Sequence, residues 1–249
     1  MANPMDQFKI ETYQPLSVGG IDASFTNSSL WMVIALVFVA GFLFVGTAAP
    51  KLVPGRMQAA VEYLYEFTRK IVDDNVGPKG RNFVPLIFAL FIFVLACNLL
   101  GMIPWVGAFT PTSHISVTLG LAVLVFVIVC FVGFAKHGFH FFSLFWPKNT
   151  FFPLAVFVAL IEFLSFLSRP FTLAIRLFAN MTAGHVLLKV FGTFVVTLGS
   201  FGALPYVLGI LPLAVTVALT ALEVLIAVVQ AYVFALLASI YLNDAINLH

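Results

Sequence analysis

Five charged side chains stand inside segments of the sequence that are otherwise apolar. They are Glu162, Arg169, Arg176, Lys189 and Glu223. A charge at the centre of a lipid bilayer costs about 2.5–3.5 kcal/mol on insertion scales, so each of these groups needs a partner or an aqueous cavity. Carboxylate and imidazole groups exchange protons, whereas a guanidinium keeps its proton. These residue types therefore predict proton transfer past a fixed positive charge.

Helical spacing predicts which of the polar groups near Arg176 share a face. At about 100° per residue, Asn180 lies on the same side of a helix as Arg176. His185 and Lys189 lie on the opposite side. Glu162 is 14 residues before Arg176, about 21 Å along the axis, so it cannot neutralise Arg176 within the helix. Either Arg176 is a structural residue paired with a carboxylate on a neighbouring helix, or its charge has a function.

An antiparallel pairing of the last two apolar segments would bring these polar groups together. Residues that face each other in such a hairpin share a midpoint, which is 203 for Arg176 with Gln230 and 204 for His185 with Glu223. Glu223 and Gln230 are seven residues apart and therefore on one helix face. The same midpoint brings Glu162 near position 245. We expect a His185/Glu223 cluster on one side of Arg176 and a polar region around Glu162 on the other.

A fixed cation between two polar regions has a definite chemical effect. It repels a hopping proton and lowers the pKa of any carboxylate that approaches it. A mobile acid would therefore discharge on one side of Arg176 and reload on the other. The chain itself contains no such mobile acid, so we expect a partner subunit to supply it.

The elements that must position these groups are apolar segments long enough to cross a bilayer. The 249 residues are 62% hydrophobic and 9% charged, with a mean hydropathy of +1.10. This composition excludes a soluble enzyme, a disordered regulator and a nucleic-acid-binding protein. We expect an all-α integral membrane protein in which the last two segments are too long for a perpendicular crossing and are either broken or strongly tilted. The predicted elements are an outer N-terminal segment at 1–29, spans at 30–49, 83–103, 115–135, 153–198 and 206–241, and an amphipathic interfacial helix at 57–76.

The basic residues orient the chain. The first loop contains Lys51, Arg56, Arg69, Lys70, Lys79 and Arg81, and the third contains Lys136 and Lys148. By the positive-inside rule these two loops are cytoplasmic. With five crossings the N-terminus is then outside and the C-terminus inside.

Residues 169–185, RPFTLAIRLFANMTAGH, resemble the R-L-F-x-N-M-x-A-G signature of the a subunit (subunit 6) of the F-type proton-translocating ATP synthase. Three further segments are similar to that family: NLLGMIP at 98–104, PTS at 111–113 and QAYVF at 230–234. The order of His185 and Glu223 resembles that of mitochondrial and alphaproteobacterial members. The resemblance therefore extends over almost the whole chain.

The resemblance implies a stator subunit of the Fo sector, in the bacterial inner membrane, with two aqueous half-channels that lead to and from a carboxylate on the rotor c-ring. It implies that Arg176 faces this carboxylate and prevents a proton short-circuit, with Gln230 beside it, and that the two long segments lie tilted along the ring. The implied partners are the c-ring, b/b′-type peripheral stalk subunits, the whole F1Fo complex and membrane lipid. No cofactor is implied, and ATP chemistry belongs to another part of the complex.

The expected proton path enters from the outer side past Asn98, His114, His185 and Glu223, and leaves past Arg176 towards Glu162. His114 replaces the acid that many bacterial relatives carry after P-T-S, and Lys189 is an additional cation. In an alternative role, Asn98 only forms a hydrogen bond that holds two helices together.

The remaining polar residues have possible roles outside proton transfer, and the chain as a whole has two alternative functions. Arg169 and Lys189 are expected to extend to the membrane interface. The spacing of His137 and His140 is a poor metal signal, so no metal site is expected. A self-contained secondary transporter would need its own mobile acid and usually an inverted repeat. A purely structural membrane subunit would have no need of a buried Arg176 opposite polar residues.

Overall fold

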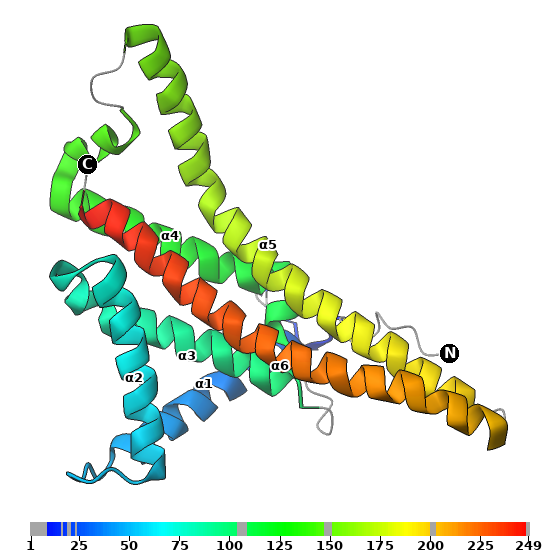
Figure 1. Ribbon diagram of the computed structural model, residues 1–249. Helices are drawn as coiled ribbons and strands as arrows, with labels where there is room; N and C mark the ends of the chain where they lie inside the picture. The colour runs from blue at the N-terminus through cyan, green and yellow to red at the C-terminus, as the bar shows by residue number, and fades with distance from the viewer. Residues whose placement is uncertain are drawn as a thin grey trace. The chain divides into compact units, whose positions relative to one another are not determined.

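The computed structural model describes residues 9–15, 17–18, 21–22, 24–103, 109–146, 151–199 and 203–247, which are mainly helical (Figure 1). Five helical segments of the described chain are long and apolar enough to cross a membrane. The predicted all-α membrane class with five spans and one amphipathic helix is confirmed. The α-helices are α1 (Asn27–Thr47), α2 (Arg56–Asn75), α3 (Val84–Gly101), α4 (Ile115–His137), α5 (Phe152–Gly199) and α6 (Ala203–Ile246).

Short elements connect the helices. The 3₁₀ helices are η2 (Pro78–Phe83), η4 (Pro111–Ser113) and η5 (Gly138–Phe145). In the N-terminal segment, strand β1 (Thr12–Gln14) pairs antiparallel with β4 (Phe25–Thr26), and β2 (Ser17–Val18) pairs with β3 (Ile21–Asp22). These strands are two or three residues long, too short for their alternation to be visible in the sequence.

Helix α2 has the amphipathic pattern that the sequence predicts. Its buried residues are Val61, Thr68, Ile71 and Val72, and the charged residues occupy the remaining face. The helix ends at Asn75, and the chain turns away two residues later at Gly77, whose φ of +76° lies in the left-handed region that favours glycine. The Gly77 amide donates to the carbonyl oxygens of Val72 and Asp73 and so satisfies the end of the helix.

The two long segments are continuous helices, which excludes the alternative in which they are broken; their tilt stays a prediction. Helix α5 contains 48 residues and α6 contains 44. Both continue past an internal proline, Pro170 in α5 and Pro212 in α6, although each proline lacks the amide that would bond to the preceding turn. Helix α6 runs beyond the predicted end at 241, because Leu242, Ala245 and Ile246 are buried at helical spacing.

The chain forms two compact units. The first comprises Met1–Phe38, Val94–His114 and Leu177–Gln230. Within it, the C-terminal part of α5 and the N-terminal part of α6 run side by side, in yellow and orange in Figure 1. Its core contains Cys97, Leu177, Met181 and Ala227, all at most 1% exposed. This unit contains most of the candidate site.

The second unit comprises Val39–Phe93, Ile115–Arg176 and Ala231–His249. Aromatic contacts join its elements: Tyr65 on α2 meets Phe88 on α3 with ring centroids 5.4 Å apart, and Phe126 on α4 meets Phe166 on α5 at 5.0 Å. The ring of Phe141 in η5 fills the space above Gly133, where a Cβ atom would clash with it. The contact of Phe126 with Phe166 packs the N-terminal part of α5 against α4. Arg176 is the last residue of α5 that belongs to this unit.

Candidate functional site

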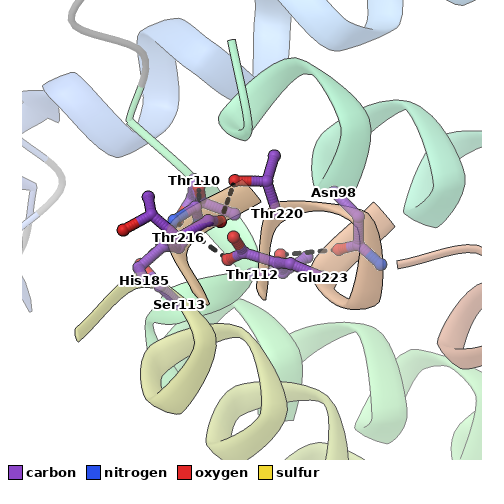
Figure 2. Close-up of polar contacts among 8 residues, drawn as sticks. All are labelled: Asn98, Thr110, Thr112, Ser113, His185, Thr216, Thr220 and Glu223. Atoms are coloured by element: carbon purple, nitrogen blue, oxygen red, sulfur yellow. Dashed lines mark hydrogen bonds and ion pairs between the residues drawn. The ribbon is translucent and has the colours of Figure 1, made fainter. Parts of the chain in front are cut away.

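His185 on α5 and Glu223 on α6 form a buried pair in the first unit (Figure 2). Nδ1 of His185 lies 3.2 Å from Oε1 of Glu223, and the two side chains are 13% and 3% exposed. The hairpin register predicts this pair, and the structure contains it. An imidazole next to a buried carboxylate is a pair between which a proton can pass.

Glu223 packs against the backbone of α5. A Cβ atom placed on Gly184, the residue before His185, would lie 2.8 Å from Oε1 of Glu223. Only a residue without a side chain leaves this space for the carboxylate. Gly184 therefore belongs to the site, although the sequence indicates it only as part of the R-L-F-x-N-M-x-A-G segment.

The opposite ring nitrogen of His185 contacts Thr110. Nε2 of His185 and Oγ1 of Thr110 are 2.7 Å apart, and either atom can be the donor. Thr110 is 4% exposed and precedes the 3₁₀ helix η4. The sequence does not mark Thr110 as part of the site, because a loop position has no periodicity that would direct its side chain towards a helix.

The P-T-S segment holds this part of the chain against α5. Oγ and the amide of Ser113 both donate to the Thr110 carbonyl, at 2.7 and 3.0 Å. Oγ1 of Thr182, on α5, donates to the Ser113 carbonyl at 3.3 Å. The turn is therefore joined to α5 at two points, Ser113 with Thr182 and Thr110 with His185.

Asn98 links α3 to the same turn and to α6. Its side-chain oxygen accepts a hydrogen bond from Oγ1 of Thr112 at 2.8 Å, and its side-chain nitrogen donates to the Ala227 carbonyl at 3.2 Å. Both contacts are buried, which favours the alternative in which Asn98 joins α3 to its neighbours by hydrogen bonds. Ala227 is one turn after Glu223, so Asn98 also positions the helix that carries the acid.

Threonines continue the polar face of α6 from Glu223 towards the start of the helix. Thr216, Thr220 and Glu223 have the spacing of one helix face and lie close together in Figure 2. Oγ1 of Thr220 donates to the Thr216 carbonyl at 2.9 Å, and Oγ1 of Thr216 donates to the Pro212 carbonyl at 2.8 Å. Each hydroxyl thus gives its one proton to the backbone and presents lone pairs outward. Thr216, Glu223 and Gln230 are seven residues apart along the sequence, and this spacing could have revealed the face.

Gln230 pairs with Asn180. The side-chain nitrogen of Asn180 donates to Oε1 of Gln230 at 3.1 Å. The register predicted Arg176 opposite Gln230, so the observed partner is one turn later along α5. Gln230 is 3% exposed, and its Nε2 atom has no hydrogen-bond partner among the described residues.

Arg176 is exposed on the surface of the chain. Its neighbours Leu173, Ala174 and Leu177 are each at most 1% exposed, so they form the buried side of this turn of α5. No described carboxylate forms an ion pair with Arg176. The alternative of a structural arginine paired within the chain is therefore not supported by the described residues.

Arg169 has partners within the chain. In the second unit its guanidinium lies 2.7 Å from Oδ2 of Asp244 and over the rings of Phe166 and Tyr241, 5.3 and 4.9 Å from their centroids. A carboxylate and two aromatic faces thus surround the guanidinium, and its extension to the membrane interface stays a prediction. Glu162, predicted near position 245, is half-buried, and within the described chain Asp244 has Arg169 as its ionic partner.

The remaining predicted residues, His114 and Lys189, differ in their surroundings. The ring of His114 stacks on Phe109 with centroids 4.8 Å apart and an interplanar angle of 16°. Burial lowers the pKa of His114 from its ordinary value of 6.5. Lys189 is exposed, one turn after His185 on α5.

The sequence is similar to known proteins along almost its whole length. Residues 29–243 match the family described as ATP synthase A chain. The chain is 51% identical to ATP synthase subunit a of Paramagnetospirillum magneticum over 250 aligned positions, which cover 100% of both chains. It is 52% identical to that of Mesorhizobium japonicum over 245 positions, 98% of this chain and 96% of the relative. It is 49% identical to that of Rhodospirillum rubrum over 249 positions, 100% of each chain.

Proposed function

The chain belongs to the ATP synthase subunit a family, and on that premise we propose that it forms the two half-channels that bring protons to and from the rotor. As a member of the family it is a multi-pass bacterial membrane protein and a proton-translocating stator subunit of Fo, within the F1Fo complex. The proposal concerns which residues carry the protons and what separates the two channels.

The observation that carries the proposal is the contrast between the two ends of one segment of α5. His185 is buried against Glu223, whereas Arg176, nine residues earlier, is exposed and has no ionic partner among the described carboxylates. An exposed arginine in an apolar helix needs a partner from outside the chain. A carboxylate on the rotor c-ring supplies that partner.

Each residue then has a role in the transfer of protons. Protons enter from the periplasmic side past His114 and past Asn98, whose hydrogen bonds also join α3 to η4 and α6. They reach His185 and Glu223 and load the rotor carboxylate. The fixed charge of Arg176 keeps that carboxylate ionised as it passes, and so prevents a direct leak between the channels.

After a turn of the ring, the loaded carboxylate releases its proton towards Glu162 and the cytoplasm. Asn180 and Gln230 hold α5 and α6 together next to Arg176. The subunit itself is not catalytic, and the b/b′-type subunits of the peripheral stalk keep it from turning with the ring. The N-terminus lies in the periplasm and the C-terminus in the cytoplasm.

Cysteine cross-linking in membranes of the intact complex tests the partner. Ala183 is exposed on the face of α5 that carries Arg176, whereas Leu173 is 1% exposed. With Cys97 and Cys130 replaced by alanine, we expect Ala183→Cys to cross-link to a small two-helix subunit that bears a carboxylate. Leu173→Cys is the buried control and should not cross-link. Cross-links confined to this chain would overturn the proposal in favour of a self-contained transporter.

A further inference from the structure

Thr110 contacts His185 at the ring nitrogen that faces away from Glu223. Its Oγ1 atom is 2.7 Å from Nε2, while Nδ1 is 3.2 Å from the Glu223 carboxylate (Figure 2). The imidazole thus has one neighbour on each nitrogen. The chemistry of these two neighbours decides which protonation states the ring can adopt in a buried site.

A hydroxyl differs from other neutral partners, because it carries one donor hydrogen and two acceptor lone pairs. A backbone carbonyl in the same place could only accept and would hold a proton on Nε2. An ammonium could only donate and would keep Nε2 unprotonated. Rotation about the Cβ–Oγ1 bond of Thr110 changes donor to acceptor without any movement of the oxygen.

We propose that Thr110 is a positioning residue for proton transfer at His185, because its hydroxyl keeps Nε2 hydrogen-bonded in both neutral tautomers and in the imidazolium. The proposal rests on the proposed function, in which His185 and Glu223 carry protons. It adds a residue that does not carry the proton but lets His185 change its protonation state while buried. Without such a partner, one of these states would leave a buried polar ring atom unpaired, which is unfavourable.

One proton moves from His185 to Glu223, and no other reactant is needed. An imidazolium holds protons on both nitrogens, with Nδ1 facing Glu223 and Nε2 facing Thr110. The Nδ1–H bond breaks and an O–H bond forms on the Glu223 carboxylate, which leaves a neutral acid and a neutral ring protonated on Nε2. Thr110 accepts from Nε2–H in both states. When the ring instead carries its proton on Nδ1, the hydroxyl turns and donates to Nε2.

The Oγ1 atom of Thr110 is held in place by the surroundings of the residue, while the hydroxyl hydrogen can rotate. The Thr110 carbonyl accepts hydrogen bonds from Oγ and from the amide of Ser113, and the side chain packs against Gly101, where any Cβ atom would clash with it. Among the described residues, the charged groups that act on His185 are Glu223 on α6 and Lys189, one turn away on α5. Thr110 adds a neutral group to this set.

Two substitutions separate the hydroxyl from the shape of the side chain. Thr110→Val keeps the shape and removes the hydroxyl, and Thr110→Ser keeps the hydroxyl and removes a methyl group. The measurement is passive proton conduction through Fo in membrane vesicles stripped of F1, from about pH 5.5 to about pH 8.5. We expect Thr110→Val to lower conduction about tenfold, the size of loss found when the hydrogen-bond partner of a metal-ligating histidine is removed, and Thr110→Ser to stay within about twofold of the parent.

The pH profile distinguishes a role in protonation from a role in packing. Thr110→Val removes the acceptor of the imidazolium, so conduction should reach its half-maximal value at a lower pH than in the parent. Parental conduction and an unchanged profile in Thr110→Val would overturn the inference. Equal losses in both variants with an unchanged profile would also overturn it, because they would indicate packing alone.

A parallel variant separates this inference from the proposed function. Glu223→Gln removes the acid and keeps the shape of the side chain. If Glu223→Gln lowers conduction and Thr110→Val does not, only the role of Thr110 is wrong. If Glu223→Gln conducts as the parent does, the proposed proton path itself is wrong. Assembly of each variant into the complex is checked by the amount of c-ring that copurifies.

Discussion

The carboxylate of Glu223 lies directly over the backbone of Gly184. A Cβ atom on Gly184 would come within 2.8 Å of Oε1 and 3.2 Å of Cδ of Glu223. Because His185 follows Gly184, the same short stretch of α5 supplies both the space for the acid and its imidazole neighbour. Close approach of the two helices and the chemistry of the pair therefore depend on one another.

Gly184→Ala is expected to move the Glu223 carboxylate away from His185. The group displaced is the end of a flexible side chain, so the subunit should still fold and assemble. The geometry of transfer would change, and misplacement of a reacting group by about 1 Å can cost about 100-fold in rate. We expect proton conduction to fall about 10- to 100-fold, as measured in F1-stripped vesicles with unchanged content of the subunit.

Gly192 offers a matched control on the same helix. A Cβ atom there would meet nothing within 4 Å. Gly192→Ala should therefore conduct as the parent does. If Gly184→Ala and Gly192→Ala both conduct normally, the close contact with Glu223 has no functional role.

Arg176→Ala is expected to abolish coupled proton transport, because a permanent cation is the barrier between the two channels. A loss of about 100-fold or more is typical when a preorganised charge is removed. Arg176→Lys should not restore transport, since an ammonium can lose its proton when desolvated and lacks the planar fork of a guanidinium. The measurement is ATP-driven acidification of inverted vesicles.

Lys189→Ala is the control for the loss of any cation from α5, since Lys189 is exposed on the same helix. It should keep most of the pumping activity. Normal pumping by Arg176→Ala would contradict the proposed barrier. If Lys189→Ala lost as much pumping as Arg176→Ala, the barrier would not depend on a cation at position 176 in particular.

Asp244→Asn is expected to destabilise the second unit. Asp244 and Arg169 are 22% and 19% exposed, and the substitution leaves Arg169 with its aromatic neighbours but no carboxylate. A hydrogen bond to a charged group contributes about 1.5–3 kcal/mol, so we expect a loss within that range. The measurement is the midpoint of thermal unfolding of the subunit in the solubilised complex.

A double-mutant cycle isolates this pair. If the two side chains interact, Arg169→Gln and Asp244→Asn together should cost less than the sum of the single losses. Asp74→Asn, an exposed carboxylate on α2, is the control and should leave the midpoint unchanged. Additive losses from the two single variants would contradict the contact.

The helices and the His185/Glu223 pair were predictable because both depend on repeating patterns. Long apolar runs indicate spans, and two helices that share a turn have a register that residue number alone determines. The register is correct for His185 with Glu223. It is one turn away for Gln230, which bonds to Asn180, because an approximate midpoint does not distinguish adjacent turns of a helix.

The contacts that the sequence did not predict involve side chains whose direction depends on tertiary packing. Arg169 turns towards Asp244 and Tyr241 because α6 continues past position 241, which hydropathy alone did not reveal. Thr110 reaches His185 from a loop, where no helical period indicates a face. The spacing of Thr216 and Glu223, in contrast, is visible in the sequence.

His114 is expected to make the stability of the subunit depend on pH. Burial lowers its pKa in the folded state, so the unfolded chain binds a proton at a higher pH than the folded chain does. Stability from this group is therefore present above the ordinary pKa of about 6.5 and declines as the pH falls towards the lowered value. His114→Phe keeps the stack on Phe109 and removes the titration. Between about pH 7.5 and about pH 5.5, the thermal midpoint of the complex should fall more in the parent than in this variant. Equal falls in both proteins would show that His114 does not contribute to the pH dependence.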